Sequence, residues 1–509
     1  MEHFHAAAIM NSNRLAIADE YSQVTFDELR HKIENAHSLF MERGLKSGDR
    51  VLVFVPMSID LYISVLALFQ MGCTAVFIDE WAKIDRLKKS CQIADCKGFI
   101  GIPMAASLGF LIQEIREIPI RMTTREIRHA KKSHFHDLAT IDGSNDTALI
   151  TFTTGSTGIP KAVKRSHEIL HQQFLSLQNT IQTRDDTVDM PVLPIVLMIN
   201  LGLGVSSIIV KWSNKKPHAL KAKKIIKTIQ KYRVNRIIAS PYFIDQLCIQ
   251  SLTENISPKL ISVREVFSGG APVFPSEAKL WLTAFPDSKV EIVYGSTEAE
   301  PISSINARKL MQTTDSTFED GLCVGKIESC TQVKILNLKT QETLKPGEIG
   351  EIAVAGNHVV KEYFGPDSAA QMAETKLLID GQLFHKTGDS GYIDHQGNLH
   401  LFGRCQQIIE WQGQPLYPFL MEYQLRHIPG VIMGTVLKIN DKLVYFLELN
   451  RCKSFQHLAY PKLGCFSPIT EDLRSLGLPD GDIRLVKIPR DPRHFSKIDY
   501  RVLQKMQKM

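Results

Sequence analysis

A stretch rich in glycine and hydroxyl residues carries the clearest chemical pattern in the chain. It reads Thr153-Thr154-Gly155-Ser156-Thr157-Gly158-Ile159-Pro160-Lys161 and follows an apolar, β-prone run. Glycines let backbone N–H groups approach an anion, hydroxyls donate hydrogen bonds, and the lysine adds a positive charge. This combination suits a polyphosphate. The spacing G-x-x-x-x-G-K-[ST] of the common phosphate loop is absent, and a polar turn is the alternative interpretation of the stretch on its own.

A second polar turn follows the predicted strand Val263–Phe267. It reads Ser268-Gly269-Gly270-Ala271-Pro272 and leaves room for a flat ligand against bare backbone. A plain turn between a strand and a helix is the alternative.

A third polar turn ends the predicted strand that begins at Glu291. It reads Tyr294-Gly295-Ser296-Thr297-Glu298 and places a hydroxyl beside a carboxylate. These oxygens could hold Mg²⁺. Alternatively, Thr297 caps a helix whose first turn contains Glu298.

Composition narrows the class of protein. The 509 residues are too many for one core, and 44% hydrophobic with 22% charged residues is typical of a soluble globular protein. A net charge of +6 on this length gives no argument for nucleic-acid binding. The nine cysteines include no C-x-x-C pair, so we expect reduced thiols in a cytoplasmic protein, without a zinc site.

No targeting or membrane segment is expected. The first residues lack the basic and apolar regions of a signal peptide. Residues 192–210 carry no charge and are about long enough to cross a bilayer. Their proline, glycines and serines favour a buried strand and helix instead.

Alternating patterns in residues 14–100 predict α/β layers around a largely parallel sheet. A helix capped by Thr25 runs to Leu39, and a second helix spans Ile59–Met71. Buried strands are predicted at Val51–Val55 and Ala75–Ile78. The polar, basic segment Ile118–Asn145 is predicted to be a surface connection.

The character of the chain changes after Pro346. Short alternating strands with Gly and Asp turns predict an antiparallel β unit up to Gly403. From about Cys405 we expect a small α+β domain with strands near 431–437 and 443–449. The predicted fold class is therefore α/β, with a large N-terminal domain (1–403) of layered subdomains plus the β unit, and a small mobile C-terminal domain (404–509).

The chain resembles the adenylate-forming enzymes: acyl-CoA synthetases, peptide-synthetase adenylation domains and luciferases. The resemblance runs from about residue 14 to residue 505. It is carried by five motifs in order: Thr153 to Lys161, Tyr294 to Glu298, Gly347-Glu348-Ile349-Gly350-Glu351, Thr387-Gly388-Asp389 and Phe402-Gly403-Arg404. Details such as Leu416-Tyr417-Pro418 and the run Asp491 to Asp499 look closest to olefin-pathway β-lactone synthetases and fatty-acid ligase-like relatives.

The resemblance implies that ATP and Mg²⁺ activate a carboxylic acid as an acyl-adenylate with release of pyrophosphate. The acid is expected to be a fatty or β-hydroxy acid, and AMP leaves as a thioester or a β-lactone forms. CoA or an acyl carrier protein is the expected acceptor in the thioester case. Fixed cationic donors and Mg²⁺ aimed at the α-phosphate would lower the barrier most.

The same resemblance implies a role for each motif residue. Lys497, Glu298 and Thr154 would be catalytic, with Glu298 and Thr154 (or Thr297) holding Mg²⁺. Lys497 would reach the α-phosphate and the acyl carboxylate, although a solvated lysine in a basic tail is its alternative reading. The nucleotide would contact Thr153, Thr154, Gly155, Ser156, Thr157, Gly158, Lys161, Gly270, Ala271, Tyr294, Gly295, Ser296, Thr297, Asp389 and Arg404, with Asp389 on the ribose hydroxyls and Gly270, Ala271 and Tyr294 at the adenine.

The chain departs from the family pattern at three places. Cys405-Gln406-Gln407 occupies the hinge, where Asp or Lys followed by Asp is usual. Ser496 replaces a glycine before the C-terminal lysine, and Met198-Ile199-Asn200 stands where an aromatic residue or histidine is common. The apolar run around this last position predicts an acyl pocket or, equally, helix core.

Two other functions compete with acid activation of a fatty or β-hydroxy acid. An amino-acid-activating enzyme that loads a carrier protein would need a pocket carboxylate for the amine, and none is identified. A catalytically weak nucleotide-binding protein is supported by Gln406-Gln407, whereas intact Glu298, Asp389 and Lys497 argue against it.

Overall fold

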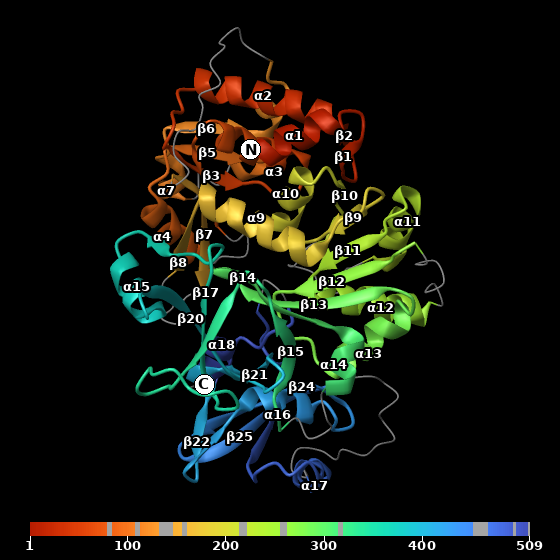
Figure 1. The fold of residues 1–509 in the computed structure, drawn as a ribbon, viewed down its shortest axis with the longest axis vertical. Helices are drawn as coiled ribbons and strands as arrows, with labels where there is room; N and C mark the ends of the chain where they lie inside the picture. Colours follow the sequence, from red (N-terminus) through yellow and green to blue (C-terminus); the bar gives the residue numbers. More distant parts are fainter. Residues whose placement is uncertain are drawn as a thin grey trace.

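The chain builds two large sheets with helices packed between and around them, followed by a smaller C-terminal part (Figure 1). The computed structural model describes residues 1–78, 84–106, 112–131, 146–154, 160–212, 221–254, 262–313, 319–450, 467–491 and 495–506. Of the phosphate-type motif, residues 155–159 and the side chains of Thr153 and Thr154 lie outside the described part.

The first sheet has seven strands in the order β18-β8-β7-β4-β3-β5-β6. Its centre, β7-β4-β3-β5-β6, is parallel, and β8 and β18 add antiparallel strands at one side. Its strands are β3 (Arg50–Phe54), β4 (Thr74–Phe77), β5 (Gly98–Gly101), β6 (Ile120–Thr123), β7 (Thr147–Thr154), β8 (Pro160–Ser166) and β18 (Glu362–Phe364). The helices beside it are α1 (Glu2–Met10), α2 (Phe26–Glu42), α3 (Ile59–Gln70), α4 (Ile84–Ala94), α5 (Pro103–Ala106), α7 (Gln113–Arg116) and α8 (Thr124–Arg128).

The second sheet has fourteen strands and a parallel centre, β10-β9-β11-β12-β13. Its register pairs Ala239 with Ser268, and Gly269 with Val293, so three strands end at one edge. The strands on this side are β1 (Leu15–Ala18), β2 (Gln23–Thr25), β9 (Val188–Pro191), β10 (Ser206–Ile208), β11 (Arg236–Ala239), β12 (Glu265–Gly269) and β13 (Lys289–Ser296). The helices are α9 (His167–Ile181), α10 (Pro194–Gly202), α11 (Ala222–Tyr232), α12 (Pro241–Thr253), α13 (Pro275–Ala284) and α14 (Ala307–Thr313).

The second sheet continues without a break into antiparallel strands. A tight hairpin joins β13 to β14, and β15, β21, β20, β17 and β16 follow across the sheet. The predicted antiparallel unit exists, but it extends the large sheet through β14 and β15. These elements are β14 (Ala299–Asn306), β15 (Leu322–Ile327), β16 (Gln332–Leu336), β17 (Gly350–Ala355), α15 (Ser368–Thr375), β19 (Lys376–Ile379), β20 (Gln382–Ile393) and β21 (Asn398–Arg404).

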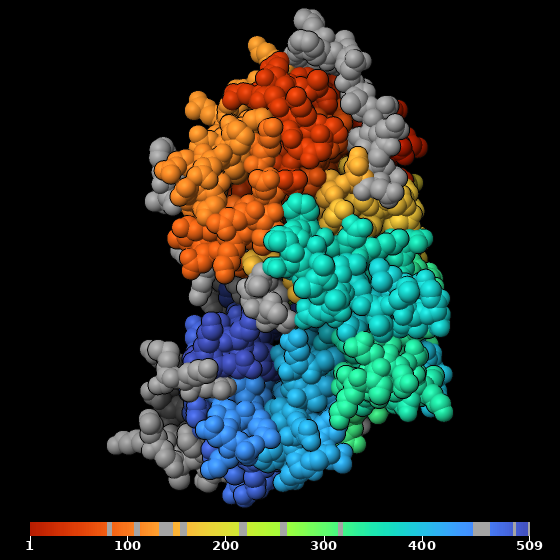
Figure 2. Space-filling view, turned by 90° about the vertical axis from the view of Figure 1, so that its left-hand side faces the viewer, coloured from red at the N-terminus to blue at the C-terminus, as the bar shows by residue number. Residues whose placement is uncertain are grey.

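The C-terminal part begins with a short 3₁₀ helix, η3 (Cys405–Gln407), at the predicted hinge. It has its own strands and apolar clusters, one of which contains Leu425, Val436 and Tyr445. Figure 2 shows the C-terminal part in blue, packed against the preceding residues of the chain, which are drawn in cyan. The elements are β22 (Ile409–Trp411), β23 (Gln414–Leu416), α16 (Pro418–Leu425), β24 (Val431–Ile439), β25 (Lys442–Leu449), α17 (Ser467–Ser475), β26 (Asp482–Leu485) and α18 (Tyr500–Lys505).

Most elements match the sequence predictions, and one segment differs. The α/β class is confirmed, and Thr25 caps α2 in a capping box with Glu28. The segment Ile118–Asn145 was predicted to be a surface connection, but its described part contains β6, which completes the first sheet, and α8. Residues 192–210 form α10 and β10, and no helix in the described part of the chain is long and apolar enough to cross a membrane.

Candidate active site

Three neighbouring strands end at the edge where the sequence predicts a ligand. Ser240 follows β11 and Ser268 lies near the end of β12; both hydroxyls are buried and have no hydrogen-bond partner among the described residues. Gly270 follows with φ +88°, a conformation that favours glycine. Buried hydroxyls without a partner, beside a half-buried glycine backbone, fit a polar ligand, because buried polar groups normally find a partner.

Tyr294, Asp389 and Arg404 meet beside this edge, although 110 positions separate the first from the last in the sequence. The Tyr294 hydroxyl donates to Asp389 Oδ2 at 2.8 Å, and Arg404 Nε lies 3.2 Å from Asp389 Oδ1. Arg404 also donates to the Thr387 carbonyl at 2.9 Å. Asp389 raises the pKa of Arg404, and burial together with Asp389 raises that of Tyr294.

Gly403 explains how Arg404 reaches this place. Its φ is +102°, and a Cβ there would lie 2.4 Å from the Cβ of Phe419 on α16. The glycine therefore lets β21 turn tightly against the C-terminal part just before Arg404 and the 3₁₀ helix.

Glu298 sits in the turn of the β13–β14 hairpin, so the alternative of a helix capped by Thr297 is wrong. Its carbonyl accepts from Val360 N–H at 2.8 Å, while Arg165 donates to the Thr297 carbonyl at 2.6 Å. The charge of Asp389 first, and that of the Glu298 carboxylate to a smaller degree, raise the pKa of Arg404.

Two side chains that sequence reasoning missed lie near Glu298. Burial lowers the pKa of Lys376 to about 8, and the nearby Glu298 charge opposes that shift. Burial, followed by the Glu298 charge, raises the pKa of Tyr363. Neither residue belongs to a motif, because both come from the β18–α15–β19 segment, which only the fold brings to the hairpin.

The donor chemistry at Glu298 fits magnesium. Carboxylate and hydroxyl oxygens are the ligands that Mg²⁺ prefers, usually one or two carboxylates with phosphate oxygens and water. No group of three His, Cys, Asp or Glu side chains in the described ranges would hold a metal alone. A magnesium ion here would therefore depend on oxygens of the substrate.

Lys161 is buried and forms an ion pair with Glu374 of α15, with 2.8 Å between Nζ and Oε2. Arg165 lies on the same face of β8, four residues on, and donates to Thr151 Oγ1 at 2.9 Å. Lys161 and Arg165 are separated by an even number of residues, and this spacing in a strand could have indicated that Arg165 lies on the same face. Nothing in the sequence indicated Glu374.

The segment that contains Lys497 reaches the same side of the large sheet. Asp491 N–H donates to the Lys497 carbonyl at 2.8 Å, and an isolated bridge pairs Arg490 with Ile498. The ring of Phe495 lies 5.9 Å from that of Tyr242, two residues after Ser240 at the end of β11. Lys497 thus belongs to a loop that already contacts the carboxyl edge of the parallel strands.

An apolar cluster lies behind this edge, between α9, α10 and the strands. It includes Ile199 of α10, Ile238 of β11 and Phe267 of β12, with Leu177, Ile181 and Val196. Asn200 points into a fully buried network instead, donating to Asp189 Oδ2 at 2.7 Å and accepting from Arg236 at 2.9 Å. The network anchors α10 and leaves its other face apolar.

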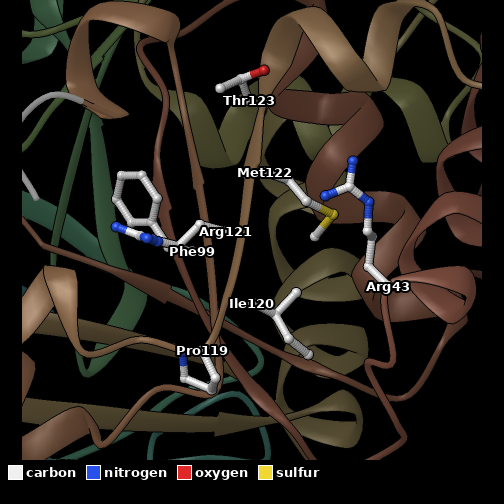
Figure 3. Close-up of a pocket in the computed structure, with 7 residues that line it drawn as sticks. All are labelled: Arg43, Phe99, Pro119, Ile120, Arg121, Met122 and Thr123. Atoms are coloured by element: carbon white, nitrogen blue, oxygen red, sulfur yellow. The ribbon is translucent and has the colours of Figure 1, made fainter.

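The larger of two described cavities lies elsewhere. It has a volume of about 460 Å³ beside the edge strand β6, and none of its lining residues belongs to the predicted site. In Figure 3, Ile120 and Met122 point to the side of Arg43, and Arg121 points to the other side, as alternation along a strand requires. The second cavity, about 260 Å³, lies against the end of α9 and includes Phe267 and Lys289.

Comparisons with known proteins identify the family of the chain. The AMP-binding enzyme family matches residues 4–364. An olefin beta-lactone synthetase of Stenotrophomonas maltophilia (strain K279a) is 30% identical over 412 residues, which cover 76% of this chain and 73% of that protein. A putative acyl--CoA ligase, YdaB, of Bacillus subtilis (strain 168) is 25% identical and covers 87% of both chains.

Solved structures share the fold over nearly the whole chain. ATP-bound MatB from Rhodopseudomonas palustris has a TM-score of 0.81 at 20% identity, with 99% of this chain and 98% of that one covered. MenE from Bacillus subtilis, in complex with ATP and magnesium ion, has a TM-score of 0.78 at 19% identity and covers 97% of each chain. With the family match over residues 4–364, the chain belongs to the AMP-binding enzyme family and is an AMP-forming acid ligase.

Proposed function

We propose that this enzyme uses ATP and Mg²⁺ to activate a fatty or β-hydroxy acid as an acyl-adenylate, and then forms a thioester or a β-lactone. The observation that carries the proposal is the meeting of Tyr294, Asp389 and Arg404 at the strand edge that the Lys497 loop contacts. Relatives named as olefin beta-lactone synthetase and acyl--CoA ligase support both outcomes.

Each charged residue of the site has a separate role in the proposed reaction. Asp389, fixed by Tyr294 and Arg404, would accept hydrogen bonds from the ribose hydroxyls. Lys161 and the loop before it would hold the β- and γ-phosphates, and Glu298 with a threonine hydroxyl would hold Mg²⁺, which offsets phosphate charge when bound. Lys497 would stabilise the charge that grows on the α-phosphate oxygens as the acid carboxylate attacks.

The apolar cluster supports an acid with a hydrocarbon chain. The cluster includes Ile199, Ile238 and Phe267 and lies where an acyl chain would extend from the strand edge. These apolar side chains provide no carboxylate that would bind the amine of an amino acid. In the first step the acid oxygen forms a bond to the α-phosphorus, and pyrophosphate leaves. In the second step a thiol, or the β-hydroxyl of the acid itself, attacks the acyl carbon, loses its proton and displaces AMP.

The first experiment is a pyrophosphate-release screen over straight-chain acids and β-hydroxy acids of graded length, with and without CoA. Release of AMP from a β-hydroxy acid without CoA would identify the lactone route. AMP release that needs CoA would identify the thioester route. If no acid supports pyrophosphate release in the presence of ATP and Mg²⁺, the proposal is wrong.

Lys497→Ala tests the mechanism. Removal of one transition-state donor typically costs about 3–4 kcal/mol, or roughly a few hundredfold in rate, so pyrophosphate release should fall below detection. ATP binding should persist, because the lysine acts on the transferring group. Lys487→Ala, in the same basic segment, is the control and should keep its activity; equal activity of wild type and Lys497→Ala would refute the assignment.

A further inference from the structure

Lys161 and Glu374 form an ion pair that brings together two distant segments. Lys161 lies on β8, Glu374 lies near the end of α15, and 213 positions separate them. The two side chains differ in exposure: that of Lys161 is 11% exposed and that of Glu374 is 43% exposed. The lysine is therefore enclosed by its surroundings, whereas much of the Glu374 side chain faces solvent.

A buried ammonium needs a negative partner, since removal from water without one is costly. In this structure the carboxylate of Glu374 is that partner. The proposed function assigns the same ammonium to the terminal phosphates of ATP. Glu374 and a triphosphate would therefore compete for one cation.

Other carboxylates make coexistence with a triphosphate unfavourable. Glu374 is close enough to Glu351 to help raise the pKa of that carboxyl, which burial raises first and which Asp389 also raises. A triphosphate would bring several more negative charges into this region. Like charges at short range repel, so Glu374 must leave Lys161 as the phosphates arrive.

We propose that Glu374 determines how strongly the site prefers a triphosphate: its carboxylate occupies Lys161 in the free enzyme and must be displaced by the terminal phosphates of ATP. The inference rests on the proposed nucleotide site. AMP has no β- or γ-phosphate, so its binding does not require the displacement. Glu374 thus weakens ATP binding and leaves AMP binding unchanged.

The chain offers a matched control. Lys164 and Glu362 form an ion pair between β8 and β18, with 2.7 Å between Nζ and Oε2, and it is more exposed than the Lys161 pair. Glu362→Gln removes the same charge from the neighbouring strand pair without touching Lys161. The control therefore separates a local effect on Lys161 from a general change in net charge.

The experiment is calorimetric titration of Glu374→Gln, Glu362→Gln and the wild type with ATP and with AMP, in Mg²⁺. Glutamine keeps the size of the side chain and can still accept from Lys161, so the fold should be kept. We expect the ATP Kd of Glu374→Gln to fall about tenfold, equivalent to about 1.4 kcal/mol, while its AMP Kd and both values for Glu362→Gln stay unchanged.

A double variant separates competition for Lys161 from repulsion alone. In a Lys161→Met background, Glu374→Gln should change the ATP Kd by less than threefold, because there is no shared cation. An unchanged or raised ATP Kd in the single variant Glu374→Gln, or a full tenfold gain in the Lys161→Met background, would overturn the inference. Wild-type protein that binds neither nucleotide would overturn the proposed function itself.

Discussion

The carboxylate of Asp389 is held on both oxygens, by the hydroxyl of Tyr294 and by Arg404. Such a carboxylate cannot rotate freely, so its remaining lone pairs point in fixed directions. A ribose diol needs two acceptors at a fixed separation. The Tyr294 hydroxyl therefore serves the nucleotide through Asp389.

Tyr294→Phe should accordingly weaken ATP and AMP binding alike. A hydrogen bond to a charged group contributes about 1.5–3 kcal/mol, which corresponds to a loss of roughly 10- to 100-fold in affinity. Calorimetric titration with both nucleotides measures it. Tyr392→Phe, on β20 where the ring stacks on His400, is the control and should bind normally. Normal binding by Tyr294→Phe would mean that Asp389 does not depend on the Tyr294 hydroxyl for its orientation.

At the scale of elements, the local signals in the sequence predicted local structure well. At the start of α2, the side chains of Thr25 and Glu28 each accept a hydrogen bond from the other's backbone N–H. The spacing of these two residues was therefore enough to locate the helix. The turn at Glu298 was ambiguous, because a hydroxyl followed by a carboxylate serves a helix cap and a hairpin equally. Pairing of β13 with β14 across a tight hairpin decided the outcome.

Non-local packing accounts for what the sequence could not predict. β6 has only four residues, one of them basic, and it forms because β5 offers an unpaired edge. Arg128, in the segment predicted to be a surface connection, donates to Asp60 at 2.9 and 2.8 Å. Glu374 and Lys376 likewise gain their roles only when α15 and β19 are placed beside β8 and the Glu298 hairpin.

Helix α16 carries a titratable group that should make the C-terminal part sensitive to pH. Burial raises the pKa of Glu422 from its usual 4.5 to about 7, while the charge of Arg426 and hydrogen bonds from Tyr500 and Thr435 oppose the shift. A carboxyl with a raised pKa in the folded state stabilises the fold below its unfolded pKa. That contribution, at most about 3 kcal/mol, is lost as the pH rises from about 4.5 through 7.

Glu422→Gln should remove this dependence. The variant should be as stable as the wild type at pH 5 and more stable at pH 8, where the wild-type carboxyl is ionised in a buried place. Urea unfolding at pH 5, 6, 7 and 8 checks it, with Glu471→Gln on the exposed face of α17 as the control. If the two stability curves of wild type and Glu422→Gln run parallel across this range, the burial argument is wrong.

At the scale of the whole molecule, the C-terminal part meets the large sheet through a small aromatic and ionic contact. Phe274, just before α13, stacks on Tyr423 of α16 with ring centroids 5.3 Å apart. Arg426 lies over the Phe274 ring at 4.8 Å and pairs with Glu277. Burial, and then the charge of Glu277, raises the pKa of Asp245 to about 8.

This contact and the Phe495–Tyr242 contact together place the Lys497 loop at the strand edge. We propose that the second half-reaction follows a turn of the C-terminal part about residues 405–407, as lids that complete and then open a site do. Such a turn would break the contacts made by Arg426. Arg426, which pairs with Glu277, is therefore expected to favour the docked arrangement, in which adenylation would take place.

Arg426→Met should shift that balance. It removes the cation that pairs with Glu277, and a buried polar group left without its partner costs roughly 1–3 kcal/mol, so the docked arrangement should lose about tenfold or more in population. Pyrophosphate release should slow by a similar factor, and amide exchange at residues 405–407 should quicken. Arg474→Met, which breaks an exposed pair with Asp480, is the control. If pyrophosphate release slows without faster exchange at these amides, the effect of the substitution lies in the site instead. Undocking of the C-terminal part should loosen residues 405–407.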